Sequence, residues 1–430
     1  MRKLLVVAGI FLFFSVHPAV AEESVIQLRQ ELEQTKALVK KLESRLNSVE
    51  QLAAAAAPAP EPVPAAESGG NSSDNLFNPA ISAVLMGGYN AYSNNPDGAK
   101  IAGFAMGEEA GLPNRGFSLG ESELNFASSI DNLFYGSLTA ALVSEGGETS
   151  VELEEAYIET LALPYGTKVK AGRFFPVLGY LNEIHAHADS FIDRPLPYRA
   201  FLGGSNYGDD GVQASVVLPT PWFSEIGGGA YRGTAFPGSG DSHGASSQSA
   251  FMRMGGDAGE SHSWLAGLSY LHAKAASRET GDLIFSGDTN LYIADVKYTW
   301  APGGNPANQS LTLQGEYFLR NEDGSYNDIG YDRDSDGWYA QAVYKFLPQW
   351  KTGYRYARLN GGGTEPGLEG TALDSMGHGP QTHSVLLEFD NSEFSSIRAQ
   401  YTRDEANLQP NNIGMLWYTV NLGAHGAHKY

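Results

Sequence analysis

From about residue 81 onward, apolar and polar side chains alternate along the chain. Leu311 and Leu313, for example, alternate with Thr312 and Gln314. A repeat of two residues predicts β-strands that have one apolar and one polar face. The 51 glycines and 22 tyrosines among 430 residues, with few strong helix formers after residue 75, also favour a large all-β domain. Both a soluble β-sandwich and a membrane β-barrel show such a pattern.

The lengths of the connections distinguish these two architectures. We predict about sixteen strands between residues 81 and 423, and every second connection between them is short. Short connections contain DN at 131, PYG at 164, TP at 220, PQ at 348 and NSE at 391, and long ones lie at 94–115, 176–209, 275–287, 321–335 and 361–381. Outer-membrane barrels alternate short periplasmic turns with long extracellular loops in this way. The sequence therefore predicts an all-β fold, a transmembrane antiparallel β-barrel of about 16 strands over residues 81–430.

The first 21 residues have the features of a secretory signal peptide. Basic residues at positions 2 and 3 precede an apolar run over residues 4–16, and Ala19-Val20-Ala21 matches a small-x-small cleavage site. The run is too short to span a bilayer as a helix. We expect cleavage after Ala21, which changes the formal net charge from −21 to −23 because residues 1–21 contain two basic residues and no acidic one.

Residues 22–52 carry a heptad repeat. The side chains of its seam, spaced alternately three and four residues apart, are Val25, Leu28, Leu32, Thr35, Val39, Leu42, Leu46 and Val49. A strict period of 3.5 residues over four heptads favours a short α-helical coiled coil over a single amphipathic helix that lies on another surface. The mixture of valine and leucine leaves dimer and trimer open. Residues 53–80, rich in Ala, Pro, Gly and Ser, form the predicted linker to the barrel.

The composition excludes several classes of function. The chain has no cysteine, so it has no disulfides, no thiolate metal site and no cysteine nucleophile. Its excess of acidic over basic residues argues against nucleic acid as a partner. The motif H-E-x-x-H and the phosphate-binding loop are absent from the sequence. We therefore do not expect an enzyme.

The order of these segments resembles a known family. A signal peptide, a periplasmic coiled coil, an Ala/Pro linker and about sixteen strands are similar to the outer-membrane porins that carry an N-terminal coiled coil, and more distantly to the phosphate-selective porins. The stretches LNEIHAHADSFIDRPLPYRAFLGGSNYGDDGVQASVVLPT and LGAHGAHKY are also similar to bacterial outer-membrane proteins labelled zinc-regulated receptors. Nothing before residue 81 is long or globular enough to be the plug domain of a gated receptor. This departure favours passive diffusion.

The resemblance has implications for location and assembly. It implies a homo-oligomer in the bacterial outer membrane, a trimer held through the coiled coil and the barrel. The barrel would contact lipid and lipopolysaccharide, and the N-terminal segment would lie in the periplasm. An even number of strands places both ends of the barrel on that side. In general porins the third extracellular loop folds into the lumen, so the resemblance implies the same course for residues 176–209.

The third long loop, residues 176–209, also has the composition of an ordered segment. It contains prolines at 176, 195 and 197 and aromatic residues at 191, 198, 201 and 207. We predict that the pore-lining and constricting residues are Glu183, Asp193, Arg194 and Arg199 from this loop, and Glu121, Glu123, Glu152, Glu154, Lys168, Lys170, Lys351, Arg355 and Arg398 from the inward faces of strands. Opposed charges across a narrow lumen orient and select solutes. The alternative is that these charges only solvate a water-filled interior.

Within that loop, His185, His187 and Asp189 stand at alternate positions. In an extended segment their side chains share one face, and imidazole and carboxylate ligands suit zinc. No fourth ligand is visible nearby, and His425 and His428 are expected at the opposite rim of the barrel. The alternative is that both histidines form hydrogen bonds within a packed loop.

The stretch YDRDSDGWY is a second candidate for a metal site. Asp332, Asp334, Asp336 and Gly337 match the start of a calcium-binding loop, but the twelfth position is Val343 where that motif requires glutamate. We expect an exposed acidic loop that binds divalent cations weakly.

These patterns favour a porin for passive diffusion of small hydrophilic or charged solutes through a loop-constricted barrel, without a cofactor. Two alternatives stay open. One is an outer-membrane transporter related to zinc uptake, in which His185, His187 and Asp189 bind the ion. The other is a barrel that conducts nothing and serves as an anchor or tether. The composition does not decide which sign of charge the pore prefers.

Overall fold

The computed structural model of the chain describes residues 40, 79–107, 110–145, 148–204, 206–240 and 244–423. The chain divides into two units, residues 1–70 and 71–430, and all described residues except Lys40 belong to the second. The predicted signal peptide, coiled coil and nearly all of the linker lie outside the described residues, as do His425 and His428, and stay predictions. None of the helices in the described part has the length and apolar character needed to cross a membrane.

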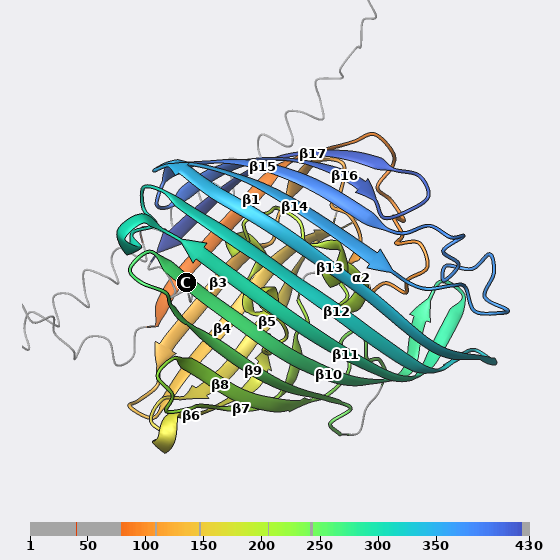
Figure 1. The fold of residues 1–430 in the computed structure, drawn as a ribbon, viewed down its shortest axis with the longest axis horizontal. Helices are drawn as coiled ribbons and strands as arrows, with labels where there is room; N and C mark the ends of the chain where they lie inside the picture. The colour runs from red at the N-terminus through yellow and green to blue at the C-terminus, as the bar shows by residue number, and fades with distance from the viewer. Residues whose placement is uncertain are drawn as a thin grey trace, which may run out of the picture. The chain divides into compact units, whose positions relative to one another are not determined.

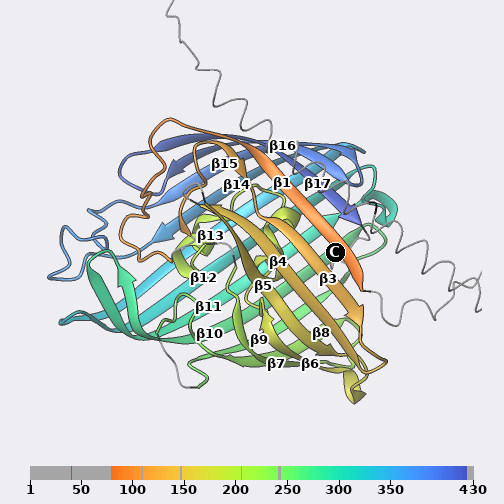
Figure 2. The same ribbon diagram turned by 180° about the vertical axis from the view of Figure 1, so that it is seen from behind.

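In the described part of the chain, seventeen strand segments form one closed antiparallel sheet (Figures 1 and 2). They are β1 (Ala80–Tyr92), β2 (Gly116–Leu119), β3 (Ser122–Ser129), β4 (Phe134–Glu145), β5 (Glu148–Thr160), β6 (Thr167–Phe174), β7 (Asp209–Val217), β8 (Phe223–Tyr231), β9 (Ser247–Asp257), β10 (His262–Thr280), β11 (Leu283–Trp300), β12 (Ser310–Tyr326), β13 (Ile329–Leu347), β14 (Trp350–Asn360), β15 (Gln381–Ser392), β16 (Ser395–Glu405) and β17 (Asn411–Gly423). The sheet closes because β1 pairs with β17 from Ser82↔Gly423 to Tyr92↔Ile413.

The segments β2 and β3 are two parts of one strand, so the barrel has the sixteen strands predicted. Both pair with β1, through Gly87↔Leu119 and Val84↔Glu123. Between these pairs β1 contributes two residues and the other strand three, which is a one-residue β-bulge. The fold class predicted from alternation and loop lengths is therefore confirmed for the barrel.

The prediction of two of the long loops is wrong. Residues 275–287 and 321–335 instead extend the hairpins β10–β11 and β12–β13, which pair as far as Thr280↔Leu283 and Tyr326↔Ile329. The extensions are stabilised by a cluster of buried apolar side chains that includes Phe285, Tyr326, Tyr331, Leu368 and Leu373. Aromatic residues favour strands, and here they also gain a packed core.

The acidic stretch at 332–336 is consequently a strand and not the exposed loop that was predicted. Asp332, Asp334 and Asp336 alternate along β13 on the face opposite the buried Tyr331, Arg333 and Ser335. An extended strand separates their side chains, whereas a calcium-binding loop must fold them around one ion.

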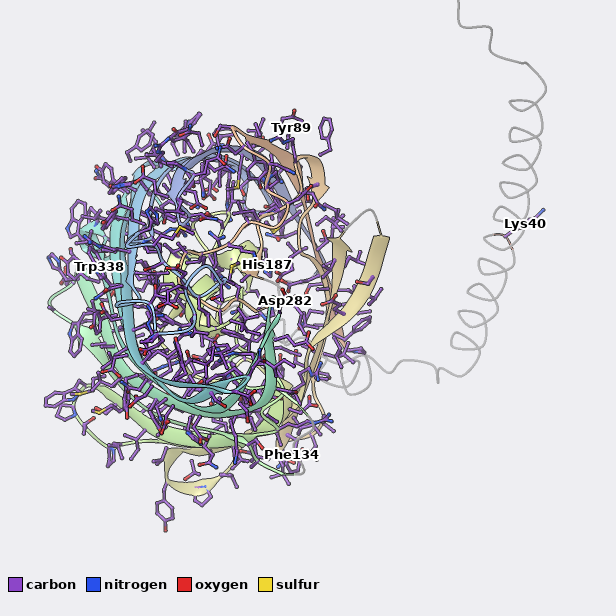
Figure 3. All side chains as sticks on the ribbon, turned by 90° about the vertical axis from the view of Figure 1, so that its right-hand side faces the viewer. Lys40, Tyr89, Phe134, His187, Asp282 and Trp338 are labelled. Carbon is purple, nitrogen blue, oxygen red and sulfur yellow. The ribbon has the colours of Figure 1, made fainter. Side chains whose placement is uncertain are left out.

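The outer face of the barrel is apolar. Large hydrophobic side chains on this face include Leu85, Leu138, Ile158, Val212, Leu268, Val296, Leu313, Val385, Leu416 and Leu422. Figure 3 shows Tyr89 and Trp338 pointing outward, while His187 lies inside the ring of strands. An apolar outer face of this extent needs a hydrocarbon environment, as transmembrane barrels have.

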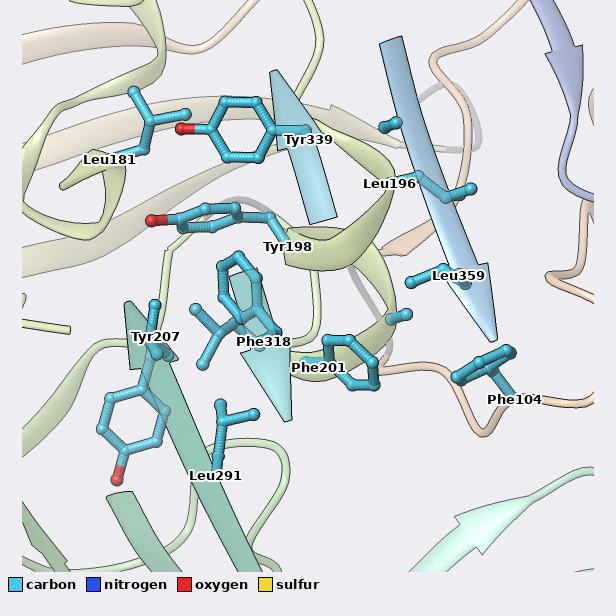
Figure 4. Packing of buried hydrophobic residues seen from close by; sticks show 14 of the residues in the cluster. Phe104, Leu181, Leu196, Tyr198, Phe201, Tyr207, Leu291, Phe318, Tyr339 and Leu359 are labelled. Atoms are coloured by element: carbon cyan, nitrogen blue, oxygen red, sulfur yellow. The ribbon is translucent and has the colours of Figure 1, made fainter. Parts of the chain in front are cut away.

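Part of the interior is apolar too, which strict alternation did not predict. Leu291 of β11, Phe318 of β12 and Tyr339 of β13 are buried on the inner face and pack against residues of the loop between β6 and β7, residues 175–208. Figure 4 shows Tyr198 and Phe201 from the short helix α2 (Leu196–Phe201) among them. The loop therefore lies within the barrel, against the inner face of β11 to β14.

Candidate functional site

One buried carboxylate attaches the loop to the wall. Glu316 on β12 accepts hydrogen bonds from the Tyr339 hydroxyl at 2.6 Å, from the Tyr198 hydroxyl at 3.1 Å, and from the backbone N–H groups of Tyr180 and Leu181 at 3.1 and 3.2 Å. Gly179, beside this contact, has φ +67°, and a Cβ there would collide with the Glu316 carboxylate. The sequence therefore supplies glycine where the loop comes closest to β12.

Ion pairs hold the rest of the loop. Asp193 pairs with Arg355 of β14, whose Nη1 also donates to the Asp193 carbonyl at 2.7 Å. Arg199 lies 3.4 Å from Asp404 of β16, and Glu183 pairs with Arg253 of β9. Four of the charged residues predicted to line the pore, namely Glu183, Asp193, Arg199 and Arg355, are thus engaged in pairs between loop and wall.

Asp189 and Arg194 pair with each other inside the loop. Arg194 Nη1 donates to Asp189 Oδ2 at 3.0 Å, and Arg194 Nη2 donates to Asn206 Oδ1 at 2.8 Å and to the Ile184 carbonyl. Asp189 was predicted as a metal ligand with His185 and His187, but the structure places it in this pair and not with the two imidazoles. The 3-10 turn Ala186–Ala188 contains His187 and separates His185 from Asp189, so these three residues do not form the extended segment that would place their side chains on one face.

Two β-bulges gather glutamates on the wall that faces the histidines. The first contains Glu121, between β2 and β3. The second lies in β5, where Thr139↔Glu155 is followed by Ala140↔Leu153, so that Glu154 is the extra residue. Bulges redirect side chains, and here Glu121, Glu123, Glu154 and Glu155 all lie near the loop. Glu155 was not predicted, although the consecutive glutamates 154 and 155 break the alternation and mark the position.

The two histidines contact these glutamates. His187 Nδ1 lies 2.7 Å from Glu123 Oε1, and His185 Nδ1 lies 3.2 Å from Glu123 Oε2 and 3.4 Å from Glu154 Oε2. On the other side of its ring, His185 Nε2 lies 3.2 Å from Glu155 Oε2. Burial alone would lower the pKa of His185, but the carboxylates of Glu123, Glu154 and Glu155 raise it well above the ordinary histidine value.

A cavity of about 730 Å³ occupies the lumen on one side of the loop. Its wall includes Phe223, Asp390 and Ser396, which lie near the short turns, and the loop residues 180–181, 183–185 and 187–190 bound it from within the barrel. Its charged lining residues are Lys170, Arg253, Lys297, Lys351 and Arg398, and Glu123, Glu155, Glu183, Asp189, Glu388, Asp390 and Glu393. The cavity therefore presents both signs of charge.

The remaining predicted pore residues lie on the wall. Lys351 contacts Glu388 and Asp390, each at 3.1 Å, and Arg398 lies 3.5 Å from Glu388. Lys170 stands over the Tyr157 ring at 4.3 Å from its centroid. Lys168 pairs with Glu159 at 3.5 Å, close to a short turn. Glu152 is exposed; it pairs in register with Ala141, which in turn pairs with Glu123. Neither Lys168 nor Glu152 is among the residues that line the cavity.

No protein-family model matches the chain. An uncharacterized protein of Aquifex aeolicus (strain VF5) is 29% identical over 344 residues, which cover 74% of this chain and 70% of that protein. One solved structure with a similar fold is the anion-selective porin from Comamonas acidovorans, with a TM-score of 0.51 and 12% identity over 80% of this chain and 99% of that one. Another is the outer membrane channel DcaP of Acinetobacter baumannii, with a TM-score of 0.52 and 12% identity over 80% of this chain and 97% of that one. The fold is that of the outer-membrane porins. OmpF of Salmonella typhi shares it as well, with a TM-score of 0.50 and 12% identity over 81% of this chain and 98% of that one.

Proposed function

We propose that the protein is a porin-like channel of a bacterial outer membrane, through which small hydrophilic solutes diffuse passively. The observation that carries this proposal is the cavity of about 730 Å³ with charged walls inside a closed barrel that has an apolar outer face. Charged groups in the lumen solvate polar solutes, and lipid covers the outer face. No cofactor and no chemical step enter the proposal.

The orientation of the barrel follows from its connections. Ala80 pairs with Ala127 and Ser82 with Gly423, so both ends of the barrel chain lie at the rim that carries the short turns. We assign this rim to the periplasm, as in outer-membrane barrels generally. The predicted coiled coil at residues 22–52 would then extend into the periplasm and hold an oligomer together, a trimer by the resemblance to porins.

The loop 175–208 would set the width and selectivity of the channel. Its attachments to β9, β12, β14 and β16 give it a fixed course across the lumen. Loop residues including Glu183, His185, His187 and Asp189 bound the cavity, and in this proposal they form the narrowest passage. Because acids and bases line the cavity together, we expect the size of the solute to matter more than the sign of its charge.

Single-channel recording in planar lipid bilayers tests this function. We expect the purified protein to produce discrete open steps. The chain has no cysteine, so Ser396→Cys, on the cavity wall, introduces a single thiol, and a charged thiosulfonate reagent should reduce its current. Leu416→Cys, on the exposed outer face, is the matched control and should not respond.

The opposite results would overturn the proposal. A folded protein that never opens would be an anchor or tether, the second alternative from the sequence. Open steps with equal effects of the reagent at both positions would show that the current does not pass through the cavity described here.

A further inference from the structure

We propose that Glu123, His185 and His187 form a binding site for one divalent transition-metal ion of the zinc class, which links the loop 175–208 to strand β3. This proposal does not depend on the channel function, because metal binding to the purified protein is measured without transport.

The positions of the ligand atoms suit such an ion. One ligand atom each from Glu123, His185 and His187 lies within 4.8 Å of the others. The Nδ1 atoms of His187 and His185 stand 2.7 and 3.2 Å from the two oxygens of Glu123. Four ligands at roughly 2.0–2.2 Å from a tetrahedral zinc ion are about 3.3–3.6 Å apart. A small outward movement of these three side chains would therefore create the coordination sphere.

His185 is already oriented as a metal ligand. Its Nε2 lies 3.2 Å from Glu155 Oε2, so that Glu155 can accept the Nε2–H while a metal ion takes the place of the proton on Nδ1. A carboxylate that holds the far nitrogen of a ligating imidazole is the usual support of a metal site. His185 Nδ1 and Glu154 Oε2 are both buried and neither makes a well-directed hydrogen bond, although they are 3.4 Å apart. A metal ion bound between them would give both atoms a partner.

The charge around the site also favours a cation. Glu121, Glu123 and Glu154 have oxygens within 4.8 Å of one another and of a His185 nitrogen, and Glu155 lies against the same ring. Arg398, a basic side chain that contacts this part of the loop, donates to the His187 carbonyl and pairs with Glu388. Glu123 and His187 are each only 6% exposed, so that solvent screens the carboxylates little. A divalent ion would neutralise part of this negative charge.

The donor set determines the class of ion. Two imidazoles and one carboxylate bind zinc, cobalt and nickel, whereas calcium and magnesium take oxygen ligands. Glu121 or Glu154 is close enough to His185 and Glu123 to supply or orient a fourth ligand. The site therefore differs from a simple acidic cluster, which would prefer calcium.

The test uses the folded full-length protein in detergent, without an affinity tag and stripped of metal by a chelator. Cobalt(II) chloride is titrated while its visible absorption is recorded, and zinc chloride then displaces it. We expect one cobalt ion per chain, with the intense bands of tetrahedral coordination. The variant His185→Gln/His187→Gln should lose these bands.

A matched control removes two histidines elsewhere. His262 and His383 lie on strands where their Nδ1 atoms contact the hydroxyls of Tyr298 and Tyr354 in exposed pairs. His262→Gln/His383→Gln should keep the bands and the affinity for cobalt. Glu155→Gln retains every proposed ligand but weakens the support of His185, and should lower the affinity for cobalt about 10–100-fold.

Several results would overturn the proposal. They are the absence of cobalt binding to the wild-type protein, equal binding by the variant that lacks His185 and His187, and displacement of cobalt by an equal concentration of calcium chloride. Circular dichroism and heat-modifiable migration on gels show whether each variant is folded. If the double variant does not fold, an unchanged affinity in folded Glu155→Gln counts against the site in the same way.

Discussion

The carboxylate of Glu316 accepts a hydrogen bond from the hydroxyl of Tyr198 at 3.1 Å, across 118 positions of the chain. One residue belongs to the barrel wall and the other to the helix α2 of the inward loop. The same carboxylate receives the hydroxyl of Tyr339 and two backbone N–H groups, so that four donors converge on one buried acid.

Replacement of this acid should loosen the loop. Glu316→Gln keeps the shape of the side chain but turns one acceptor into a donor that faces other donors. We expect a loss of about 1–3 kcal/mol in the free energy of unfolding, because buried donors stay unsatisfied. Urea unfolding in lipid vesicles measures the loss, and channel recordings should show a noisier current. The exposed Glu260→Gln is the control, and equal stability of the two variants would contradict the role of Glu316.

The ion pair of Asp193 and Arg355 should be a second attachment of similar importance. The Arg355 side chain is 1% exposed and lies over the Phe191 ring at 4.5 Å. Arg355→Met removes the charge that balances the Asp193 carboxylate, which keeps the hydrogen bond donated by Gln400, and we expect a loss of about 3–5 kcal/mol.

A double-mutant cycle measures the interaction between Asp193 and Arg355 separately from the effect of removing each side chain. Asp193→Asn combined with Arg355→Met should recover part of the stability, since no uncompensated charge stays buried. Arg403→Met, which breaks a partly exposed pair with Glu405, should cost about 1 kcal/mol or less. Additive effects of the two changes at 193 and 355 would show that they do not interact.

The outer face should tolerate no charge in the hydrocarbon region. Leu268 on β10 is 56% exposed on that face. Leu268→Arg should reduce the free energy of folding into lipid by about 2–4 kcal/mol if it reaches the bilayer midplane, and by less nearer the interfaces. Folding yield into vesicles measures this effect. Leu408→Arg, in the exposed connection between β16 and β17, should fold like the wild type, and a similar loss at both positions would argue against a lipid-facing Leu268.

The stability of the loop between β14 and β15 should depend on pH because of Asp374. The backbone N–H groups of Gly370 and Met376, and then the Thr364 hydroxyl, hold the pKa of Asp374 below its ordinary value of 3.8. The hydrogen bonds to the ionised form therefore stabilise the loop above that value and are lost as the pH falls through the lowered pKa. Asp374→Asn should make the loop more open even at neutral pH.

Amide hydrogen exchange at Gly370 and Met376 checks this prediction. After correction for the intrinsic effect of pH, exchange in the wild type should accelerate only below about pH 4, and exchange in Asp374→Asn should be fast at pH 7. Asp97→Asn, a change in another exposed loop, serves as the control. Slow exchange in both variants at pH 7 would show that Asp374 does not organise the loop.

Much of the barrel could be predicted because its strands obey one simple rule. Where lipid lies on one side and polar groups on the other, as around Leu313 and Gln314, alternation reveals each strand and its orientation. The rule fails where both faces are apolar. Tyr292 faces outward while Leu291 and Ile293 are buried within the barrel, so the period of two residues disappears. The extended hairpins were missed in a similar region, near Phe285 and Tyr326.

The candidate site was predictable only in part for a different reason. His185 and His187 could be selected because they are close in sequence. Their partners Glu123 and Glu155 stand 64 and 30 positions away, and only the folded loop brings them together. The bulge at Glu154 also moves Glu155 to the inner face, which strict alternation does not allow. Asp189 was grouped with the histidines on spacing alone, and the turn that follows His185 directs it to Arg194.

The apolar core inside the barrel constrains the order in which the molecule can be assembled. The loop 175–208 is synthesised before β7 and everything that follows, yet it packs on β11, β12, β13 and β14. We expect that the later strands close around a loop that is already in place, and that the pairing of β17 with β1 is the last step. On such a route an early segment of the chain serves as the template for the wall that encloses it.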